Sequence, residues 1–393
     1  MGLMSEYISR KLSASDLEAE LLRLIKEYNT RRETFAIIYI SALGKQIPDI
    51  PLSQDDYYTI HDLLRNVESP RLDMYIETPG GSAEAAEDIV KFLHTKFKEV
   101  CFVVSGEAKS AGTIMVLSGD EILMTETGSL GPIDAQVRIG RSVISAHDYM
   151  EWTDKKRKEA DSSKRLNPFD ATMVAQISPG ELMGVNHALK YAEELVSEWL
   201  VKYKFKNWAE TETRKLPVTK EMKTECAKRI AGELTNHSKW RTHGRSIKSG
   251  TLQKIGLKIT TIDSNSELGD IVYRIQTVCR LLLGSTSTYK IFATEKEKVF
   301  KSAAPASNQP IKLPNQVIAA EVAEFEVKCP SCGKSHKVYA KFIPKKEIDE
   351  DFTKKGEIAY PKDNKLKCDC GFEIDLSGMR NEIEIKVGKK ILI

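Results

Sequence analysis

Two short turns in the sequence carry groups that could perform nucleophilic chemistry. Residues 78–82 read TPGGS, and residues 108–113 read AKSAGT, with Ser110 in the middle. A serine that opens a helix within a turn of mostly small residues is exposed, and the N–H groups at that helix N-terminus favour developing negative charge. The pair of turns therefore offers a nucleophile and an oxyanion hole. Either turn alone is also what an ordinary strand–turn–helix junction requires.

The elements around these turns predict how they meet. Residues 35–41, 71–78 and 99–106 are short apolar runs typical of buried strands, and residues 53–67 and 82–97 have helical spacing. This alternation predicts βαβ units and a mainly parallel sheet. In an open sheet of this kind, ligands bind at the carboxyl ends of the strands, so both turns are expected to face one crevice.

Three further segments have clear patterns. Residues 15–30 predict an amphipathic helix capped by Ser15, and residues 180–204 and 267–283 predict two long helices. Residues 153–170 are highly charged and show no periodicity, so we expect an exposed and mobile loop there.

Residues 74–137 carry a resemblance to a known family. This stretch resembles the Clp/crotonase fold of serine peptidases and, within it, the serine dehydrogenase proteinase family, a relative of the Clp protease subunit and signal peptide peptidase A. The resemblance extends over about residues 35–263. It implies an α/β fold, a Clp/crotonase-like superhelix of ββα units, and a serine endopeptidase. By this resemblance, Ser110 matches the nucleophile, and Gly81 and Ala111 match the residues whose N–H groups form the oxyanion hole.

The general base is where the sequence departs from the Clp pattern. At the position of the Clp histidine this chain has Asp134, and close to the position of the Clp aspartate it has His243. The two groups would therefore have exchanged places. We expect His243 to act as general base for Ser110, with Asp134 orienting the imidazolium.

A Ser–Lys dyad, as in the signal peptide peptidases, is the competing hypothesis. There the lysine follows the serine by several tens of residues and must be desolvated to act as a base. The lysines at suitable distances from Ser110 are Lys155, Lys156, Lys158 and Lys164. They lie in a charged run, which is more typical of a solvated surface.

The resemblance also implies a substrate and an assembly. Residues 137–145 resemble the Clp edge strand along which a peptide adds as another strand, so a peptide or unfolded protein is the expected substrate. Members of the family enclose their sites by forming homo-oligomers. The sequence contains no phosphate-binding loop, so any ATP dependence would require a separate unfoldase.

Two other classes of function remain open from the sequence. Crotonase relatives bind acyl-CoA thioesters, although enolate chemistry needs donors rather than a nucleophile at the Ser110 turn. Alternatively, the chain is a catalytically degenerate assembly or binding protein whose C-terminal module recruits a protein partner.

The C-terminal module contains Cys329, Cys332, Cys368 and Cys370, which form two paired-cysteine turns within β-rich sequence. This arrangement resembles a zinc ribbon with a closed Cys₄ site, so we expect a structural Zn²⁺. The second pair is C-x-C rather than C-x-x-C, and His336 is a possible replacement ligand. The other three of the seven cysteines are scattered, which argues against a disulfide framework.

Composition sets the remaining expectations. The chain has 393 residues, with 59 Lys+Arg against 56 Asp+Glu, a balance that does not favour nucleic acid as a partner. It shows no signal peptide and no apolar run of about 20 residues, so we expect a cytoplasmic protein without a membrane span. We predict an N-terminal helical segment (1–34), a peptidase domain (35–301), a linker (302–315) and a zinc-ribbon-like domain (316–393).

Overall fold

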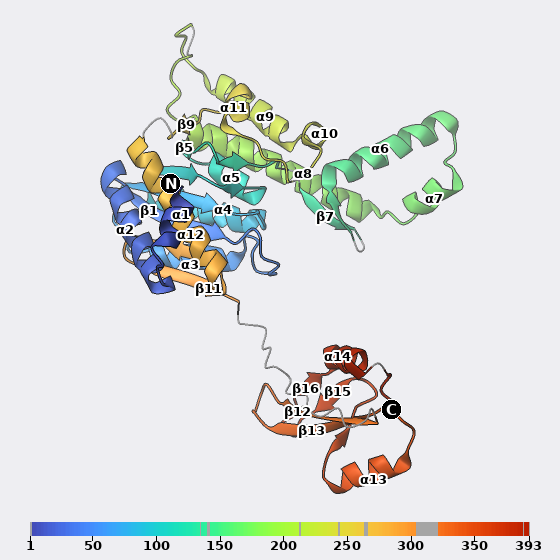
Figure 1. Ribbon diagram of the computed structural model, residues 1–393. Coiled ribbons are helices and arrows are strands. Elements are labelled where there is room, and N and C mark those ends of the chain that lie inside the picture. The colour runs from blue at the N-terminus through green and yellow to red at the C-terminus, as the bar shows by residue number, and fades with distance from the viewer. Residues whose placement is uncertain are drawn as a thin grey trace. The chain divides into compact units, whose positions relative to one another are not determined.

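The computed structural model describes residues 2–133, 135–139, 142–211, 214–242, 244–262, 266–303, 321–387 and 389–392. The chain divides into two compact units, Met1–Ala303 and Ala304–Ile393 (Figure 1). Most of the predicted linker, residues 302–315, lies outside the described residues. None of the described helices is both long and apolar enough to span a bilayer.

The larger unit is built on a sheet of seven strands among its described residues, in the order β11-β10-β1-β2-β3-β5-β9. Strands β1, β2, β3, β5 and β9 run parallel; β10 pairs antiparallel with β1, and β11 pairs antiparallel with β10 at one edge of the sheet. Their bounds are β1 Phe35–Ser41, β2 Arg71–Glu77, β3 Glu99–Val104, β5 Glu121–Met124, β9 Thr260–Thr261, β10 Thr288–Ala293 and β11 Lys298–Ser302. The predicted α/β architecture with a mainly parallel sheet is confirmed.

Helices cover both faces of this sheet, so its central strands are buried on both sides. In β1, Ile37 and Tyr39 belong to one apolar core, and Ile38 and Ile40 belong to the other. This division follows from the alternation of side chains along a strand. It explains why the sequence of β1 is apolar throughout instead of alternating with polar residues.

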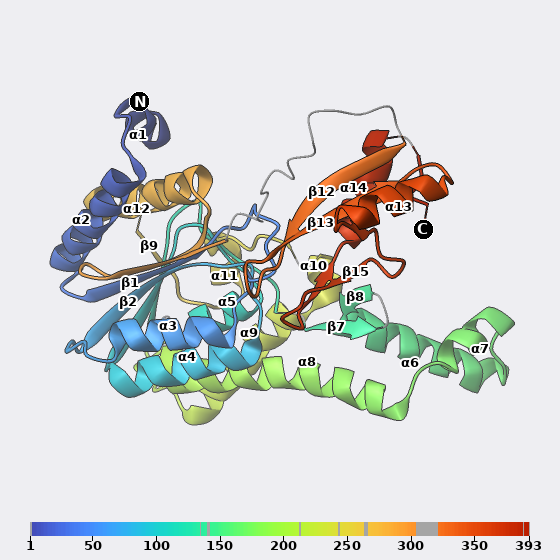
Figure 2. The same ribbon diagram turned by 90° about the horizontal axis from the view of Figure 1, so that it is seen from below.

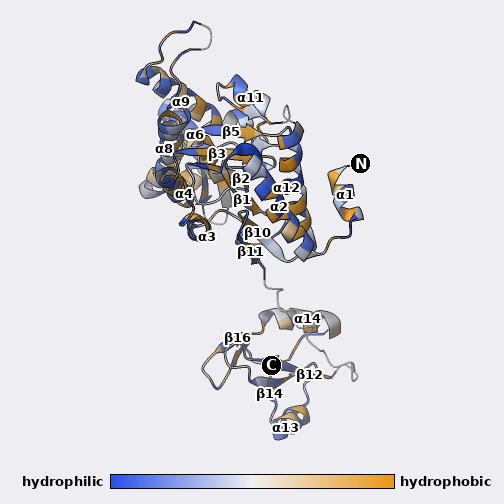
Figure 3. Cartoon of the chain, turned by 90° about the vertical axis from the view of Figure 1, so that its left-hand side faces the viewer, coloured by the Kyte–Doolittle hydropathy of each residue, from blue (hydrophilic) through white to orange (hydrophobic). Residues whose placement is uncertain are grey.

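Two sets of helices form these faces. One face is covered by α2 (Ala14–Arg32) and α12 (Ser266–Ser285), with α1 (Leu3–Ser9) beside α12; the apolar and polar residues of α2 and α12 are orange and blue in Figure 3. The opposite face carries α3, α4, α5, α8 and α9, and Figure 2 shows the sheet between the two sets. Their bounds are α3 Gln54–Leu64, α4 Ala83–Lys96, α5 Ala111–Leu117, α8 Pro179–Trp199 and α9 Lys220–Thr235.

The helices predicted over residues 15–30, 180–204 and 267–283 are present as α2, α8 and α12, with one correction to the start of α2. Helix α2 begins after Ser13, whose hydroxyl accepts from the Asp16 N–H while the Asp16 carboxylate accepts from the Ser13 N–H. The cap is therefore Ser13, paired with Asp16, and not Ser15, which would pair with Glu18. Both serines have an acidic residue three positions on, so the sequence pattern alone does not choose between them.

Residues 153–163 and 168–170 are helical, so the predicted loop is wrong over most of its length. They fall on α6 (Ala146–Ser163) and the start of α7 (Pro168–Val174), which extend away from the sheet with the N-terminal half of α8 (Figure 1). A small apolar cluster that includes Tyr149 and Val185 packs α6 against α8. Few residues of the charged segment 153–170 are apolar and packed against other elements. Its sequence therefore shows no helical periodicity.

The predicted single strand over residues 137–145 is also wrong. The chain forms a hairpin here, with β7 (Gln136–Ile139) antiparallel to β8 (Ser142–Ser145). The long helix predicted over residues 180–204 is α8, which continues as one π-helical turn, Leu200–Lys204.

The smaller unit is a β-rich fold with a small core. Strands β12 (Val322–Lys328) and β13 (Ser335–Lys341) form an antiparallel pair, and β14 (Ile358–Ala359) joins β13. Its other elements are α13 Lys346–Lys354, β15 Lys365–Lys367, β16 Glu373–Asp375 and α14 Ser377–Val387. The core includes Phe325, Val338 and Leu376. A core of this size generally needs a disulfide or a metal to stabilise it.

Candidate active site

Ser110 occupies a strained position at the start of α5. It follows the short strand β4 (Glu107–Ala108) and has φ 48° and ψ −117°, in a region that residues with a Cβ rarely adopt. Such strain persists only where the surroundings fix the backbone. Here the Gly112 N–H donates to Lys109 O at 2.8 Å, and the Ile114 N–H donates to Ser110 O at 3.1 Å. The turn thus presents a serine hydroxyl at a sharp strand-to-helix junction.

The neighbouring TPGGS turn requires its two glycines. Gly80 has φ 96°, and a Cβ added there would lie 2.6 Å from the Cβ of Ser110. Gly81 has φ 149°, and an added Cβ would lie 2.4 Å from the backbone nitrogen of Leu52. Since real Cβ atoms do not approach other atoms this closely, the contact between the two turns depends on glycine at both positions.

A backbone bridge orients the Gly81 N–H. The Leu52 N–H donates to Gly80 O at 2.7 Å, and the Ser82 N–H donates to Leu52 O at 2.9 Å. In a parallel bridge of this pattern, the N–H of the middle residue, Gly81, is directed away from Leu52. Neither this N–H nor that of Ala111 donates to another group within the described ranges. The two turns therefore offer two backbone donors beside Ser110.

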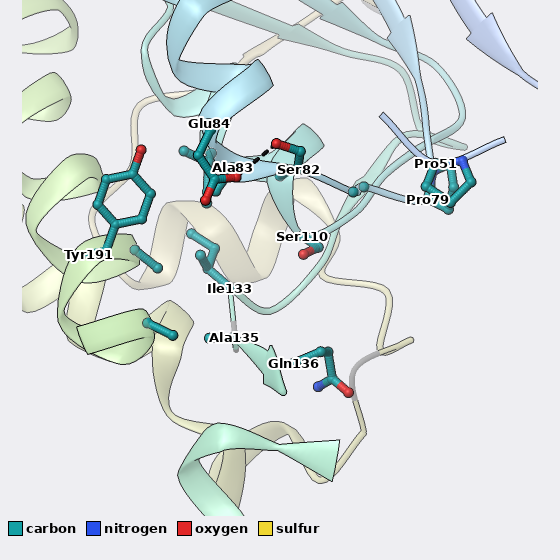
Figure 4. A pocket seen from close by; sticks show the side chains of 16 residues that line it. Pro51, Pro79, Ser82, Ala83, Glu84, Ser110, Ile133, Ala135, Gln136 and Tyr191 are labelled. Atoms are coloured by element: carbon teal, nitrogen blue, oxygen red, sulfur yellow. Dashed lines mark hydrogen bonds between the residues drawn. The ribbon is translucent and has the colours of Figure 1, made fainter. Parts of the chain in front are cut away.

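A cavity of about 420 Å³ opens in front of Ser110. The cavity is bordered by both turns, by Pro51, and by apolar side chains from three other segments (Figure 4). These apolar side chains are Ile114, Ile133, Ala135, Ala188, Tyr191 and Ala192. The Tyr191 hydroxyl donates to Glu87 at 2.5 Å, which fixes the ring at the cavity wall. The site combines a half-buried serine that borders the cavity, two backbone donors and an apolar recess.

Comparison with known proteins places this geometry in a family. Residues 6–180 match the family of ClpP-like SDH-type serine proteinases. The match covers less than half of the 393 residues and includes both turns of the site. It spans β1–β8, and it confirms the predicted family and its Clp-like α/β fold. The family consists of serine proteinases, so the match points to a serine peptidase.

Two curated relatives come from Methanocaldococcus jannaschii. Uncharacterized protein MJ1495 is 26% identical over 248 residues, which cover 61% of this chain and 71% of that protein. Uncharacterized protein MJ0137 is 31% identical over 137 residues, which cover 32% of this chain and 46% of that protein.

Two solved structures are similar to the chain in part. One is a mutant of the 1510-N membrane-bound stomatin-specific protease, with a TM-score of 0.32 and 15% identity, covering 56% of this chain and 79% of that one. The other is a second mutant of that protease in complex with a substrate peptide, with a TM-score of 0.33 and 14% identity, covering 66% and 90%.

The two residues predicted to act with Ser110, His243 and Asp134, lie outside the described residues. Their flanking residues are described. Ile133 and Ala135, on either side of Asp134, both border the Ser110 cavity. Beyond His243, Ile247 forms a two-bond backbone bridge with Leu130, close to the start of the Asp134 segment.

The four lysines of the alternative hypothesis lie on or just after α6 and not at the cavity. Lys155, Lys156 and Lys158 are on α6, and Lys164 follows its last turn. None of the four borders the Ser110 cavity. The Lys156 ammonium contacts Asp170 at 2.5 Å and Glu159 at 3.0 Å. Hydrogen bonds to these carboxylates raise the pKa of Lys156, which is opposite to the change that a lysine base requires.

Sequence reasoning missed Lys109, the residue before Ser110. Its side chain is only 5% exposed, and burial lowers its pKa. It does not border the cavity; its ammonium instead contacts the segments around Leu130 and Ser246. The only available signal was a lysine between alanine and serine in a turn otherwise made of small residues.

The smaller unit brings the four predicted cysteines together. One ligand atom from each of Cys329, Cys332, Cys368 and Cys370 lies within 4.8 Å of the others. The Sγ–Sγ distance is 3.6 Å for Cys329 and Cys370, and also for Cys332 and Cys368. A tetrahedral site with Zn–S bonds of about 2.3 Å needs sulfur atoms about 3.8 Å apart. The four thiols therefore fit a zinc ion and are too far apart for disulfides. His336 is not a member of this cluster.

Proposed function

We propose that the larger unit hydrolyses peptide bonds through an acyl-enzyme on Ser110. The Ser110 Oγ attacks the carbonyl carbon of the scissile bond, and the N–H groups of Gly81 and Ala111 stabilise the oxyanion that forms. The C–N bond then breaks, the amine leaves with a proton, and water hydrolyses the ester. Family membership supports the reaction class.

One observation carries this proposal. Ser110 is held at positive φ in front of the cavity, beside two backbone N–H groups that have no acceptor within the described part of the chain. An ordinary helix cap would have a relaxed backbone and a side chain that accepts from its own helix, but the Ser110 side chain accepts no such bond. Strain together with free donors is the expected arrangement for a nucleophile.

For the general base we propose His243, with Asp134 as the group that orients it. His243 takes the proton from the Ser110 Oγ and later gives it to the leaving amine. The described flanks of both residues support this choice, because Ile133 and Ala135 border the cavity and Ile247 bridges to Leu130. Lys156 is less suited because its carboxylate partners hold it protonated.

We infer that the substrate is a peptide or an unfolded protein that binds in extended form. Among the described strands, β7 pairs with β8 along one edge and with no strand along the other. Gln136, the first residue of β7, borders the cavity. A peptide that adds to this edge would pair through its backbone, which gives little preference for sequence. We also propose that the chain forms a homo-oligomer that encloses the site.

For the smaller unit we propose a structural Zn²⁺ bound by Cys329, Cys332, Cys368 and Cys370. With four protein ligands, the ion would have no open position and would stabilise the fold rather than take part in hydrolysis. The distances between the sulfur atoms support this proposal.

Turnover of unstructured peptides by site variants tests the peptidase. Ser110→Ala should reduce kcat on the order of 10⁴-fold or more, and His243→Gln by a comparable factor. Ser82→Ala is the matched control, because Ser82 borders the same cavity but caps α4 through the Ala85 N–H. This variant should keep most of the activity. Equal activity of Ser110→Ala and wild type would overturn the proposal, and unchanged turnover by His243→Gln would exclude that base.

A further inference from the structure

Lys109 is buried directly beneath the Ser110 turn. Its side chain runs along Gly131 so closely that a Cβ added to Gly131 would lie 2.7 Å from the Cδ of Lys109. Burying an ammonium group is tolerated only where its N–H groups find acceptors. The structure supplies these acceptors at the residue that precedes the proposed nucleophile, which suggests a role beyond packing.

The Lys109 ammonium has three acceptors in two separate segments. It donates to Leu130 O at 3.3 Å, to Arg245 O at 3.2 Å and to the Ser246 Oγ at 2.8 Å. Three N–H groups therefore meet three acceptors, which is the full capacity of the group. Residues 245 and 246 are more than a hundred positions along the chain from Lys109, so this contact joins distant segments.

The backbone of Lys109 completes the connection. Its N–H donates to Thr78 O at 3.0 Å in the TPGGS turn, and its carbonyl accepts from the Gly112 N–H at 2.8 Å in α5. Thr113, in the same helix, bonds through its hydroxyl to both the N–H and the carbonyl of Gly131. Residues on both sides of Ser110 are thus bound to the segment around residues 130–131.

We propose that Lys109 is a positioning residue that holds Ser110 in its strained conformation and docks residues 244–247 against the nucleophile turn. Its ammonium stays outside the cavity, so it acts through the backbone rather than on the substrate. The role in catalysis rests on the proposed peptidase function, whereas the docking of residues 244–247 does not.

The experiment compares Lys109→Met with Lys248→Met. Lys248 is a matched control because its ammonium donates to Glu126 O at 3.3 Å and Thr127 O at 2.7 Å, and thus anchors the same segment without touching the nucleophile turn. Amide hydrogen exchange reports docking through the N–H groups of Leu130 and Ile247, which form the bridge beside Lys109. Peptide turnover gives kcat and KM separately.

For Lys109→Met we expect exchange at these two amides to become about tenfold faster or more, because a buried charged donor is lost. We expect kcat to fall about 10- to 100-fold with KM within about twofold, since a small displacement of a nucleophile affects the chemical step. Lys109→Arg, which keeps donors at this place, should recover part of both losses. Lys248→Met should resemble wild type in exchange at Leu130 and in kcat.

Wild-type exchange and kcat in folded Lys109→Met would overturn the inference, as would equal losses in Lys248→Met. If Lys109→Met does not fold, Ser246→Ala removes one exposed acceptor and should accelerate exchange at Ile247 by about twofold to fivefold; no acceleration would also overturn it. A wild-type protein without turnover would remove the peptidase proposal and the catalytic part of this inference. The exchange result would still decide whether Lys109 docks the segment.

Discussion

The two units fix their chemically important residues by different means. In the larger unit, Ser110 has positive φ although it carries a Cβ, and its neighbours Ala108 and Ala111 belong to a large apolar core. In the smaller unit, the residues with positive φ in the two paired-cysteine turns are Gly333 and Gly371, which adopt this conformation without strain. Its core is much smaller.

This difference shows what each unit needs in order to fold. A large core provides enough packing to impose a strained conformation on a functional residue. A small core does not, so the two paired-cysteine turns use relaxed glycines, and the proposed Zn²⁺ would supply the stability that the core lacks. Single substitutions near Ser110 should therefore leave the larger unit folded. Substitution of any of the four cysteines should unfold the smaller unit.

Removal of the metal is expected to have the largest effect. If Zn²⁺ binds the four cysteines, it contributes about 10–16 kcal/mol of binding free energy to folding of the smaller unit. A strong chelator, or Cys332→Ser, should unfold that unit and leave the melting transition of the larger unit unchanged. Circular dichroism and metal analysis of the full chain measure this. A smaller unit that stays folded without metal would break the comparison.

Gly81→Ala should impair catalysis without unfolding the chain. The added methyl group meets the backbone of Leu52 and an unfavourable φ, so the oxyanion donor must move. Loss of one such donor costs about 10²- to 10³-fold in kcat. Gly184→Ala is the control, because an added Cβ there meets no atom within 4 Å. Unchanged kcat in Gly81→Ala would show that this N–H is not used.

The sequence predicted the elements whose signals are local. The strands β1, β2 and β3 are continuous apolar runs, and the two small-residue turns follow β2 and β4 directly. The four cysteines were predicted as one cluster because the spacing within each pair constrains its geometry. Each of these features depends on neighbours within a few positions of the chain.

The remainder depends on distant contacts. The bridge that orients Gly81 comes from Leu52, and the acceptors that bury Lys109 come from residues 245 and 246. Helix α6 was predicted as a loop because its few apolar residues, Tyr149 among them, pack on α8 rather than on the main cores. Contacts between residues so far apart in the chain cannot be predicted from local sequence periodicity.

The smallest expected effect concerns the cavity wall and pH. Hydrogen bonds from Lys91 and Tyr191 lower the pKa of Glu87 below its ordinary value of 4.5. The stabilisation is therefore complete above about pH 4.5 and is lost as the pH falls through the lower value in the folded state. Glu87→Gln should lower Tm by less than about 2 °C at pH 7, and the difference should disappear in strong acid. A difference that grows in acid would contradict this sign.

The site of covalent labelling by a fluorophosphonate tests the central claim most directly. This reagent phosphonylates an activated serine, and tandem mass spectrometry of the digested protein locates the adduct. We predict one adduct, on Ser110, in the wild-type protein, and none in Ser110→Ala. An adduct on another serine, or no adduct on the assembled wild-type protein, would contradict the assignment of Ser110 as the nucleophile.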